Sequence, residues 1–192
     1  MHIIEVEFQQ KPLRVHTFLA DVPLHDLWVI HLPGGGEGRT LADFQRLLAF
    51  GDLERANPIV AGLFKLRWTL GRLFGWDDEK HDLPSASYIH RLTADDRQRS
   101  LVEPGSDDGP FRVIYRFENE SLGEIVNATV HAFALTAMEQ TAHGYTLYLG
   151  VYVKKVSLLT PFYMALIDPF RKLLVYPAMI RKMERTWAKA YA

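Results

Sequence analysis

The chain has 192 residues, of which 48% are hydrophobic and 23% are charged, and its formal net charge is -1. This length and composition predict one globular domain over residues 1–192, and the near-zero charge does not favour binding to nucleic acid. The chain contains no cysteine, which excludes disulfides, thiolate metal ligands and a cysteine nucleophile.

The N-terminal residues 1–7 carry two glutamates where a signal peptide needs a positive start and an apolar run. No uncharged apolar run approaches the roughly 20 residues needed to span a bilayer. We therefore expect a cytoplasmic protein without a transmembrane segment.

Residues 13–50 are expected to form a strand, a short helix and a longer helix. Apolar and polar residues alternate from Leu13 to Leu19, as in a strand, and Pro23 is placed to open a helix that carries Leu27, Trp28 and Ile30. Glycines over residues 34–38 predict a flexible turn, because the phosphate-loop lysine is missing. Thr40 is a candidate N-cap for a helix over residues 41–50.

The middle of the chain predicts one more helix and then short strands. Asn57-Pro58 is a typical helix entry, and the apolar positions continue to Phe74. Residues 75–82 form an acidic stretch that is expected to be a solvated loop, so no metal site is predicted. Residues 87–92 and 100–102 are expected to be short strands separated by a turn.

Three longer strands are predicted over residues 111–117, 122–136 and 145–156. They are joined by short turns, which favours an antiparallel meander. A jointed helix is expected from Thr160 to Trp187, because prolines recur at 161, 169 and 177. Its core-facing residues are predicted to be Leu173, Tyr176, Met179, Ile180, Met183 and Trp187, with basic residues on the opposite face.

This order of elements predicts an α+β, helix-grip fold. A curved antiparallel sheet would wrap around the long, proline-kinked C-terminal helix, and two to three shorter helices would follow the first strand. A cavity between sheet and helix is expected in such an arrangement.

Four blocks of the sequence, residues 71–77, 127–131, 144–154 and 163–177, are similar to a bacterial family of uncharacterised proteins. The resemblance, which covers roughly residues 12–188, is to domain-of-unknown-function family twenty-eight sixty-seven. It implies a START-like fold of the polyketide cyclase and birch-allergen type (SRPBCC), and it implies no catalytic residues. That superfamily includes lipid carriers, cyclases and hormone receptors, so the fold alone does not select a function.

Asn127, Thr129 and His131 are spaced two apart on the expected strand 122–136, so they would share one face. If the odd-numbered face looks inward, these residues line the cavity. His131 could then act as a hydrogen-bond donor or a general base, together with Asn127, Tyr115 or Glu124. If the even-numbered face looks inward, they lie on the outer surface. The small apolar residues at even positions favour the second arrangement.

Other side chains are candidates for ligand contacts. Tyr148, Tyr152 and Tyr163 are amphipathic aromatics near the end of the sheet and the entry to the helix, and Tyr115 lies on a neighbouring strand. An ordinary core would use the same residues. Arg171 could pair with a ligand anion, although a structural salt bridge is the expected role.

The predicted function is therefore binding of a small apolar or amphipathic ligand, without a cofactor. A cyclase, dehydratase or hydrolase that uses His131 is one alternative, and a non-catalytic interaction module or homodimer is another. The basic face of the terminal helix leaves peripheral contact with anionic lipid open.

Overall fold

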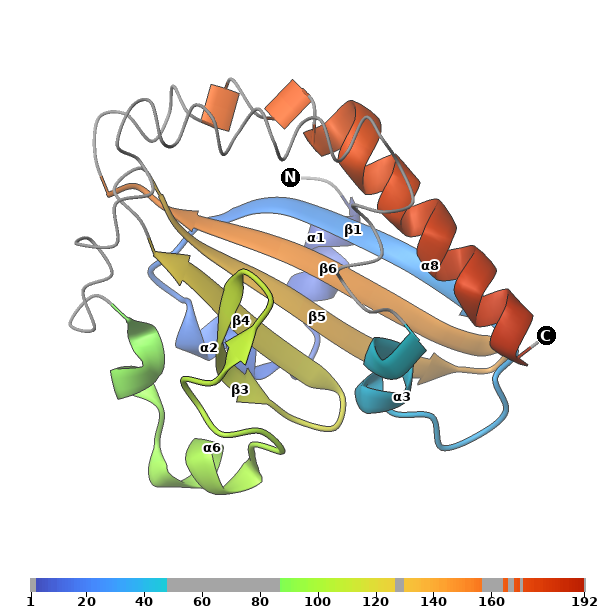
Figure 1. Ribbon diagram of the computed structural model, residues 1–192, viewed down its shortest axis with the longest axis horizontal. Coiled ribbons are helices and arrows are strands. Elements are labelled where there is room, and N and C mark those ends of the chain that lie inside the picture. The colour runs from blue at the N-terminus through green and yellow to red at the C-terminus, as the bar shows by residue number, and fades with distance from the viewer. Residues whose placement is uncertain are drawn as a thin grey trace.

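The computed structural model of the protein describes residues 3–47, 87–126, 130–156, 164–165, 168–169 and 171–191. At its centre lies a six-stranded antiparallel sheet in the order β1-β6-β5-β4-β3-β2 (Figure 1). The two long central strands, β5 and β6, pair along their whole length. The strands span Leu24–Pro33 (β1), Asp107–Asp108 (β2), Phe111–Arg116 (β3), Glu120–Val126 (β4), His131–Thr141 (β5) and Gly144–Lys154 (β6).

Helices pack on both faces of the sheet, so the described part of the chain has an α+β architecture in three layers (Figure 1). On one face, α1 (Ile3–Gln9) and α2 (Arg14–Phe18) contribute Phe8, Val15 and Phe18 to a core that also contains Tyr115 and Phe133. We call this the α2 face. On the other face, the C-terminal helix α8 (Tyr176–Tyr191) and α3 (Leu41–Leu47) bury Trp187, Met183, Leu41 and Phe44 against β1, β5 and β6. We call this the α8 face.

The strand expected over residues 13–19 and the helix expected after Pro23 are both wrong. Residues 14–18 form α2, and the backbone N–H groups of Arg14 and Val15 donate to the Glu120 carboxylate, which caps the start of that helix. Residues 24–33 form β1, which pairs with β6 from Leu24 to Pro33. A long ladder of backbone hydrogen bonds outweighs the weak local preference of such a segment.

The short strands expected over residues 87–92 and 100–102 are both wrong. Tyr88–Arg91 form a short 3-10 helix (η3), and Ala94–Arg99 form α6 in place of the expected turn. The side chain of Thr93 accepts from the backbone of Asp96, and Asp96 accepts from the backbone of Thr93, which is a capping box. The helix expected from Asn57 and the acidic loop at 75–82 lie outside the described residues.

The single strand expected over residues 122–136 is two strands, β4 and β5, which pair with each other in an antiparallel hairpin. Val126 and His131 are paired residues at its closed end. Between residues 131 and 135 of β5 the buried positions are the odd-numbered ones, whereas in β4 positions 120, 122 and 124 are buried together with 121. The preference for the even face as the core of one continuous strand was therefore wrong for His131.

Other predictions are confirmed. The strand at 111–117 is β3, and the strand at 145–156 corresponds to β6. Residue Thr40 begins α3 with a reciprocal pair of hydrogen bonds to Asp43, as its N-cap prediction requires.

The C-terminal helix begins with a π-helical turn, η4 (Arg171–Val175), which continues directly into α8. Pro177 has no N–H to donate to the preceding turn, which accounts for a wider turn there. Tyr176, Met183 and Trp187 are buried as predicted, but Leu173 is 73% exposed and does not belong to the core. The predicted start of the helix at Thr160 lies outside the described residues.

No helix in the described ranges is both long enough and apolar enough to pass through a bilayer.

Candidate functional site

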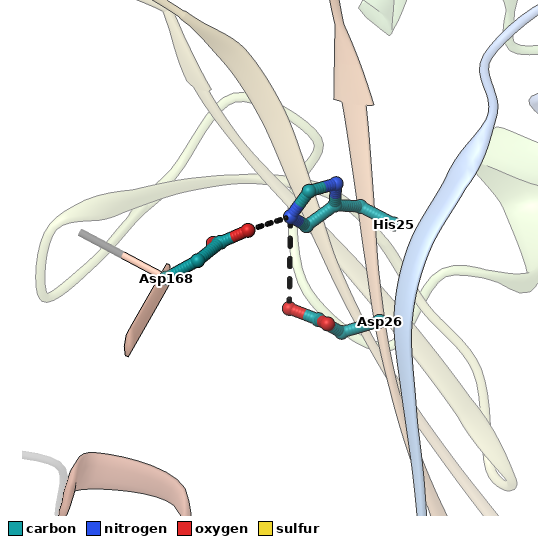
Figure 2. A group of neighbouring side chains, drawn as sticks. All are labelled: His25, Asp26 and Asp168. Carbon is teal, nitrogen blue, oxygen red and sulfur yellow. Dashed lines mark hydrogen bonds and ion pairs between the residues drawn. The ribbon is translucent and has the colours of Figure 1, made fainter. Parts of the chain in front are cut away.

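An ionic cluster joins the start of β1 to the helical turn that precedes α8. Asp26 of β1 accepts from Arg171 Nη2 at 2.8 Å, and Arg171 Nη1 donates to Asp168 at 3.0 Å. Lys172 Nζ lies 3.2 Å from the second oxygen of Asp26. His25 Nε2 lies 2.8 Å from Asp168 Oδ2 and 4.0 Å from Asp26 Oδ2, and Figure 2 shows its ring facing both carboxylates. We call these five residues the β1–α8 cluster.

His25, Asp26 and Asp168 could together offer three ligand atoms to a metal ion, since these atoms lie within 4.8 Å of one another. Each carboxylate oxygen, however, already has a nitrogen of Arg171, Lys172 or His25 as a neighbour. The two carboxylates face the two cations Arg171 and Lys172, and a divalent ion would have to displace both cations. The arrangement is that of an ion-pair network that holds the helix to the sheet.

Tyr176 connects the β1–α8 cluster to the interior of the protein. Arg171 donates a hydrogen bond to the Tyr176 hydroxyl, and its guanidinium lies 5.2 Å from the centre of the ring. The same ring packs 5.1 Å from the ring of Trp28 on β1. Burial raises the pKa of Tyr176, so the residue is a neutral phenol at physiological pH. The cluster thus fixes the position of this ring against the α8 face.

A pocket of about 180 Å³ lies between α8 and the sheet, and Tyr176 forms part of its wall. Gln45 of α3 also lines the pocket, and its side-chain Oε1 is buried without a hydrogen-bond partner in the described structure. Thr136 and Lys182 add polar groups. The apolar lining comes from β3, β5, β6, α3 and α8 and includes Phe44, Phe111, Ala134, Leu135, Leu149, Val151, Tyr176, Met179 and Met183.

His131 lies on the α2 face of the sheet, where it contacts Tyr88 and Phe133, and is 2% exposed. Its Nε2 is 3.1 Å from Glu124 Oε2, and its ring is edge-on to Tyr88 at 5.0 Å. Glu124 also accepts hydrogen bonds from the Ser87 hydroxyl and the Tyr88 N–H. Burial opposes ionisation of Glu124, but the bonds from His131, Ser87 and Tyr88 outweigh it and lower its pKa.

The order of these contacts matters for chemistry. A nucleophilic serine needs an imidazole as its base, with the carboxylate behind the imidazole. Here Ser87 and His131 both contact the carboxylate of Glu124, so the serine hydroxyl points to the acid. These side chains form a buried hydrogen-bond network that holds η3 onto the sheet.

A second buried carboxylate, Glu120, lies on the same strand, β4. Glu120 is 2% exposed and accepts from the N–H groups of Arg14 and Val15, each at 2.8 Å, and from the Tyr115 hydroxyl at 2.6 Å. Burial is the main reason that the pKa of Tyr115 is raised.

The remaining candidate ligand residues are dispersed. Tyr152 is buried on the α2 face, and its hydroxyl has no partner in the described structure. Tyr148 lines a different pocket at the end of the sheet. Asn127, Thr129 and Tyr163 lie outside the described residues. Arg171 forms the salt bridges that the sequence favoured for it.

His25, Asp26 and Gln45 were not found by reasoning from the sequence. His25 and Asp168 are 143 positions apart, and the local sequence around either residue does not predict a contact with the other. Asp168 and Arg171 do lie in the block 163–177, which carried the resemblance, but that block gave no partner for them.

The sequence matches the family described as "Protein of unknown function (DUF2867)" over residues 18–178. No match was found among curated proteins or among solved structures. The matched range includes the described residues of the β1–α8 cluster and Gln45.

Proposed function

Because the chain belongs to DUF2867, a family without an assigned activity, its function has to be derived from the chemistry of its sites. We propose that the protein binds a small amphipathic ligand in the pocket between the sheet and α8. The ligand has an apolar body and one hydrogen-bond donor. The observation that carries this proposal is the buried Gln45 Oε1, which has no hydrogen-bond partner in the described structure and lies in the wall of a largely apolar pocket.

The size of the pocket limits the ligand. An apolar cavity of about 150 Å³ is large enough to bind benzene, and this pocket measures about 180 Å³. A single aromatic ring or a short acyl chain fits that volume, whereas a sterol or a long-chain lipid does not. The sequence-based expectation of a small apolar or amphipathic ligand is thereby narrowed to molecules of about one ring.

The donor requirement follows from the cost of an unpaired polar atom. A buried acceptor without a partner costs about 1–3 kcal/mol. A ligand hydroxyl or N–H that reaches Gln45 would recover part of this energy, while the ring contacts Met179, Met183 and Leu149. Tyr176, which the β1–α8 cluster positions, would contact the same ring.

Phenol and toluene are suitable probes, because they share a ring and differ in the donor. Titrations followed by protein NMR should show both probes shifting residues of the pocket. Gln45→Leu should weaken phenol binding about fivefold, the worth of one neutral hydrogen bond of about 1 kcal/mol, and should leave toluene binding unchanged or tighter. Ala134→Leu should abolish binding of both by filling the pocket.

Ala132→Leu provides the matched control, since Ala132 lies on the same strand and face, is partly buried and does not line the pocket. This variant should bind both probes like the parent. Binding of neither probe to the folded parent, or equal loss of toluene and phenol in Gln45→Leu, would contradict the proposal. Native mass spectrometry of protein from its host would reveal the bound species directly.

The alternatives from the sequence have less support. A reaction at His131 needs access for a substrate, and this side chain is 2% exposed and lies under the Tyr88 ring on the opposite face of the sheet. An interaction module or peripheral membrane protein would use exposed residues such as Leu173 with the basic residues of α8. Light scattering with and without anionic vesicles distinguishes these from a ligand-binding monomer.

A further inference from the structure

A second pocket, of about 440 Å³, lies at the end of the sheet where the β5–β6 hairpin meets the residues around 118–119. It shares no described lining residue with the pocket under α8. Its walls come from residues 11–13, residues 38–41, the β3–β4 turn, the end of β5 and the start of β6. We call it the hairpin pocket. Its volume falls within the roughly 300–1,000 Å³ typical of small-molecule sites.

Backbone hydrogen bonds fix one wall of the hairpin pocket. Leu41 N–H donates to the carbonyl of Glu118 at 2.9 Å, and Met138 N–H donates to the carbonyl of Asn119 at 2.8 Å. The β3–β4 turn is thereby joined both to the start of α3 and to β5. The side chains of Glu118 and Asn119 therefore project from a backbone that is already in place before any ligand arrives.

Tyr145 fixes the adjoining part of the wall, which residues 38–39 form. Its hydroxyl accepts from the Arg39 N–H at 2.9 Å and donates to the Gly36 carbonyl at 2.8 Å. Arg39 Nε donates to the Gly35 carbonyl at 2.9 Å, and its guanidinium lies 4.4 Å from the centre of the Tyr191 ring. The glycine-rich segment, which the sequence described only as a flexible turn, thus holds an arginine at the edge of a cavity.

The floor of the hairpin pocket is apolar. Leu41 is fully buried, Ala137 is 1% exposed and Met138 is 6% exposed. Pro12 and Leu13 also line the pocket. An apolar floor of this kind suits the hydrocarbon part of a ligand, while its polar part remains at the rim.

The charges at the rim come from two acids and two bases. Lys11 and Glu139 neutralise each other at 2.6 Å, and the Tyr148 hydroxyl donates to the same carboxylate at 3.3 Å. Within the described structure, Arg39 and Glu118 line the same pocket but form no ion pair with each other. The rim therefore presents one cation and one anion that are not joined, above an apolar floor.

We propose that the hairpin pocket binds a small zwitterion with an apolar body, the chemical class of a free apolar amino acid. The ligand carboxylate pairs with the guanidinium of Arg39, its ammonium pairs with the carboxylate of Glu118, and its side chain lies on Ala137 and Met138. This inference rests on a different pocket from the one under α8 and does not depend on the function proposed for that pocket.

Three probes with the same skeleton test the charge requirement on the full chain by calorimetry. Phenylalanine carries both charges, phenylacetate carries only the carboxylate, and phenethylamine carries only the ammonium group. Phenylalanine should bind at least about tenfold more tightly than either analogue, because each analogue lacks one charge-assisted hydrogen bond.

Two variants then assign the charges. Arg39→Gln should weaken phenylalanine and phenylacetate by about tenfold and leave phenethylamine unchanged. Glu118→Gln should weaken phenylalanine and phenethylamine and leave phenylacetate unchanged. Glu37→Gln is the matched control, because Glu37 is an exposed acid of the same glycine-rich segment and does not line the pocket. It should bind all three probes like the parent.

The outcome that overturns the proposal is equally specific. Equal affinity for the three probes, binding of phenylacetate alone, absence of phenylalanine binding, or phenylalanine binding that survives both substitutions would refute it. A circular dichroism spectrum like that of the parent shows that each variant is folded. If the parent protein binds toluene but not phenylalanine, this inference fails and the function proposed above stands. If it binds phenylalanine but not toluene, the function proposed above fails and this inference stands.

Discussion

Asp26→Asn tests whether the β1–α8 cluster holds the C-terminal helix to the sheet. The side chain of Asp26 is 7% exposed, and its partner Arg171 is 18% exposed, so water screens this pair only partly. A hydrogen bond to a charged group is worth about 1.5–3 kcal/mol. The contact with Lys172, which is 46% exposed, adds little. Because Asp168 still pairs with Arg171 in the variant, we expect a loss of about 2 kcal/mol in the free energy of unfolding.

The measurement is urea unfolding followed by circular dichroism. A loss of about 2 kcal/mol corresponds to a fall in melting temperature of roughly 4–8 °C for a domain of this size. Asp95→Asn is the control, because the Asp95–Arg99 pair is 3.5 Å long and 72% and 58% exposed. It should change the free energy of unfolding by less than about 0.5 kcal/mol.

A double-mutant cycle isolates the pair from other effects of the substitution. Arg171→Met alone and together with Asp26→Asn should give a coupling energy of at least about 1 kcal/mol. If Asp26→Asn changes the free energy of unfolding as little as Asp95→Asn, or if the coupling energy is near zero, the cluster does not stabilise the packing of the C-terminal helix on the sheet. The account of how Tyr176 is positioned would then be wrong as well.

Two other predictions concern Asp96 and the glycine-rich segment. The hydrogen bonds from Arg14 are the main reason that the pKa of Asp96 is lowered from 3.8 to about 2, and each tenfold change in acidity corresponds to about 1.4 kcal/mol. A carboxylate whose pKa is lower in the folded than in the unfolded state stabilises the fold at pH values above its unfolded-state pKa, and this stabilisation is lost as the pH falls through its folded-state pKa. The stability advantage of the parent over Asp96→Asn should therefore shrink by about 2 kcal/mol between pH 6 and pH 2 in urea titrations. A constant difference would contradict this reasoning. Gly35 has a φ of 93°, and a Cβ there would lie 2.6 Å from the Trp187 ring. Thermal unfolding should show that Gly35→Ala loses at least about 3 kcal/mol of stability. Gly36→Ala should lose only about 1–2 kcal/mol, because Gly36 has a similar φ but open space around it. Similar losses in both variants would refute the contact with Trp187.

The sequence by itself determined the elements whose local signals agree with their surroundings. Thr40 and Asp43 form the start of α3 as the capping pattern predicts, and β3 follows its alternation from residue 111. The spacing of Tyr176 and Trp187 correctly predicts the buried stripe of α8. In each case the hydrogen bonds or the apolar period involve residues close in the chain, and neighbours in the chain are all that a sequence displays directly.

Only the tertiary structure decided the rest, because the deciding contacts join residues far apart in the chain. Residues 24–33 are a strand because β6 pairs with them, and residues 14–18 are a helix whose first N–H groups are capped by Glu120, more than a hundred positions away. Leu173 fits the helical period but is exposed, since the π-helical turn changes the rotation before α8 begins. The same holds for the sites. The β1–α8 cluster brings Asp26 and Arg171 together across 145 positions. Gln45, whose Oε1 has no partner among the described residues, lines a pocket that forms only where α3 and α8 pack on the sheet. Charge and burial at these sites are set by long-range packing, which no local pattern encodes.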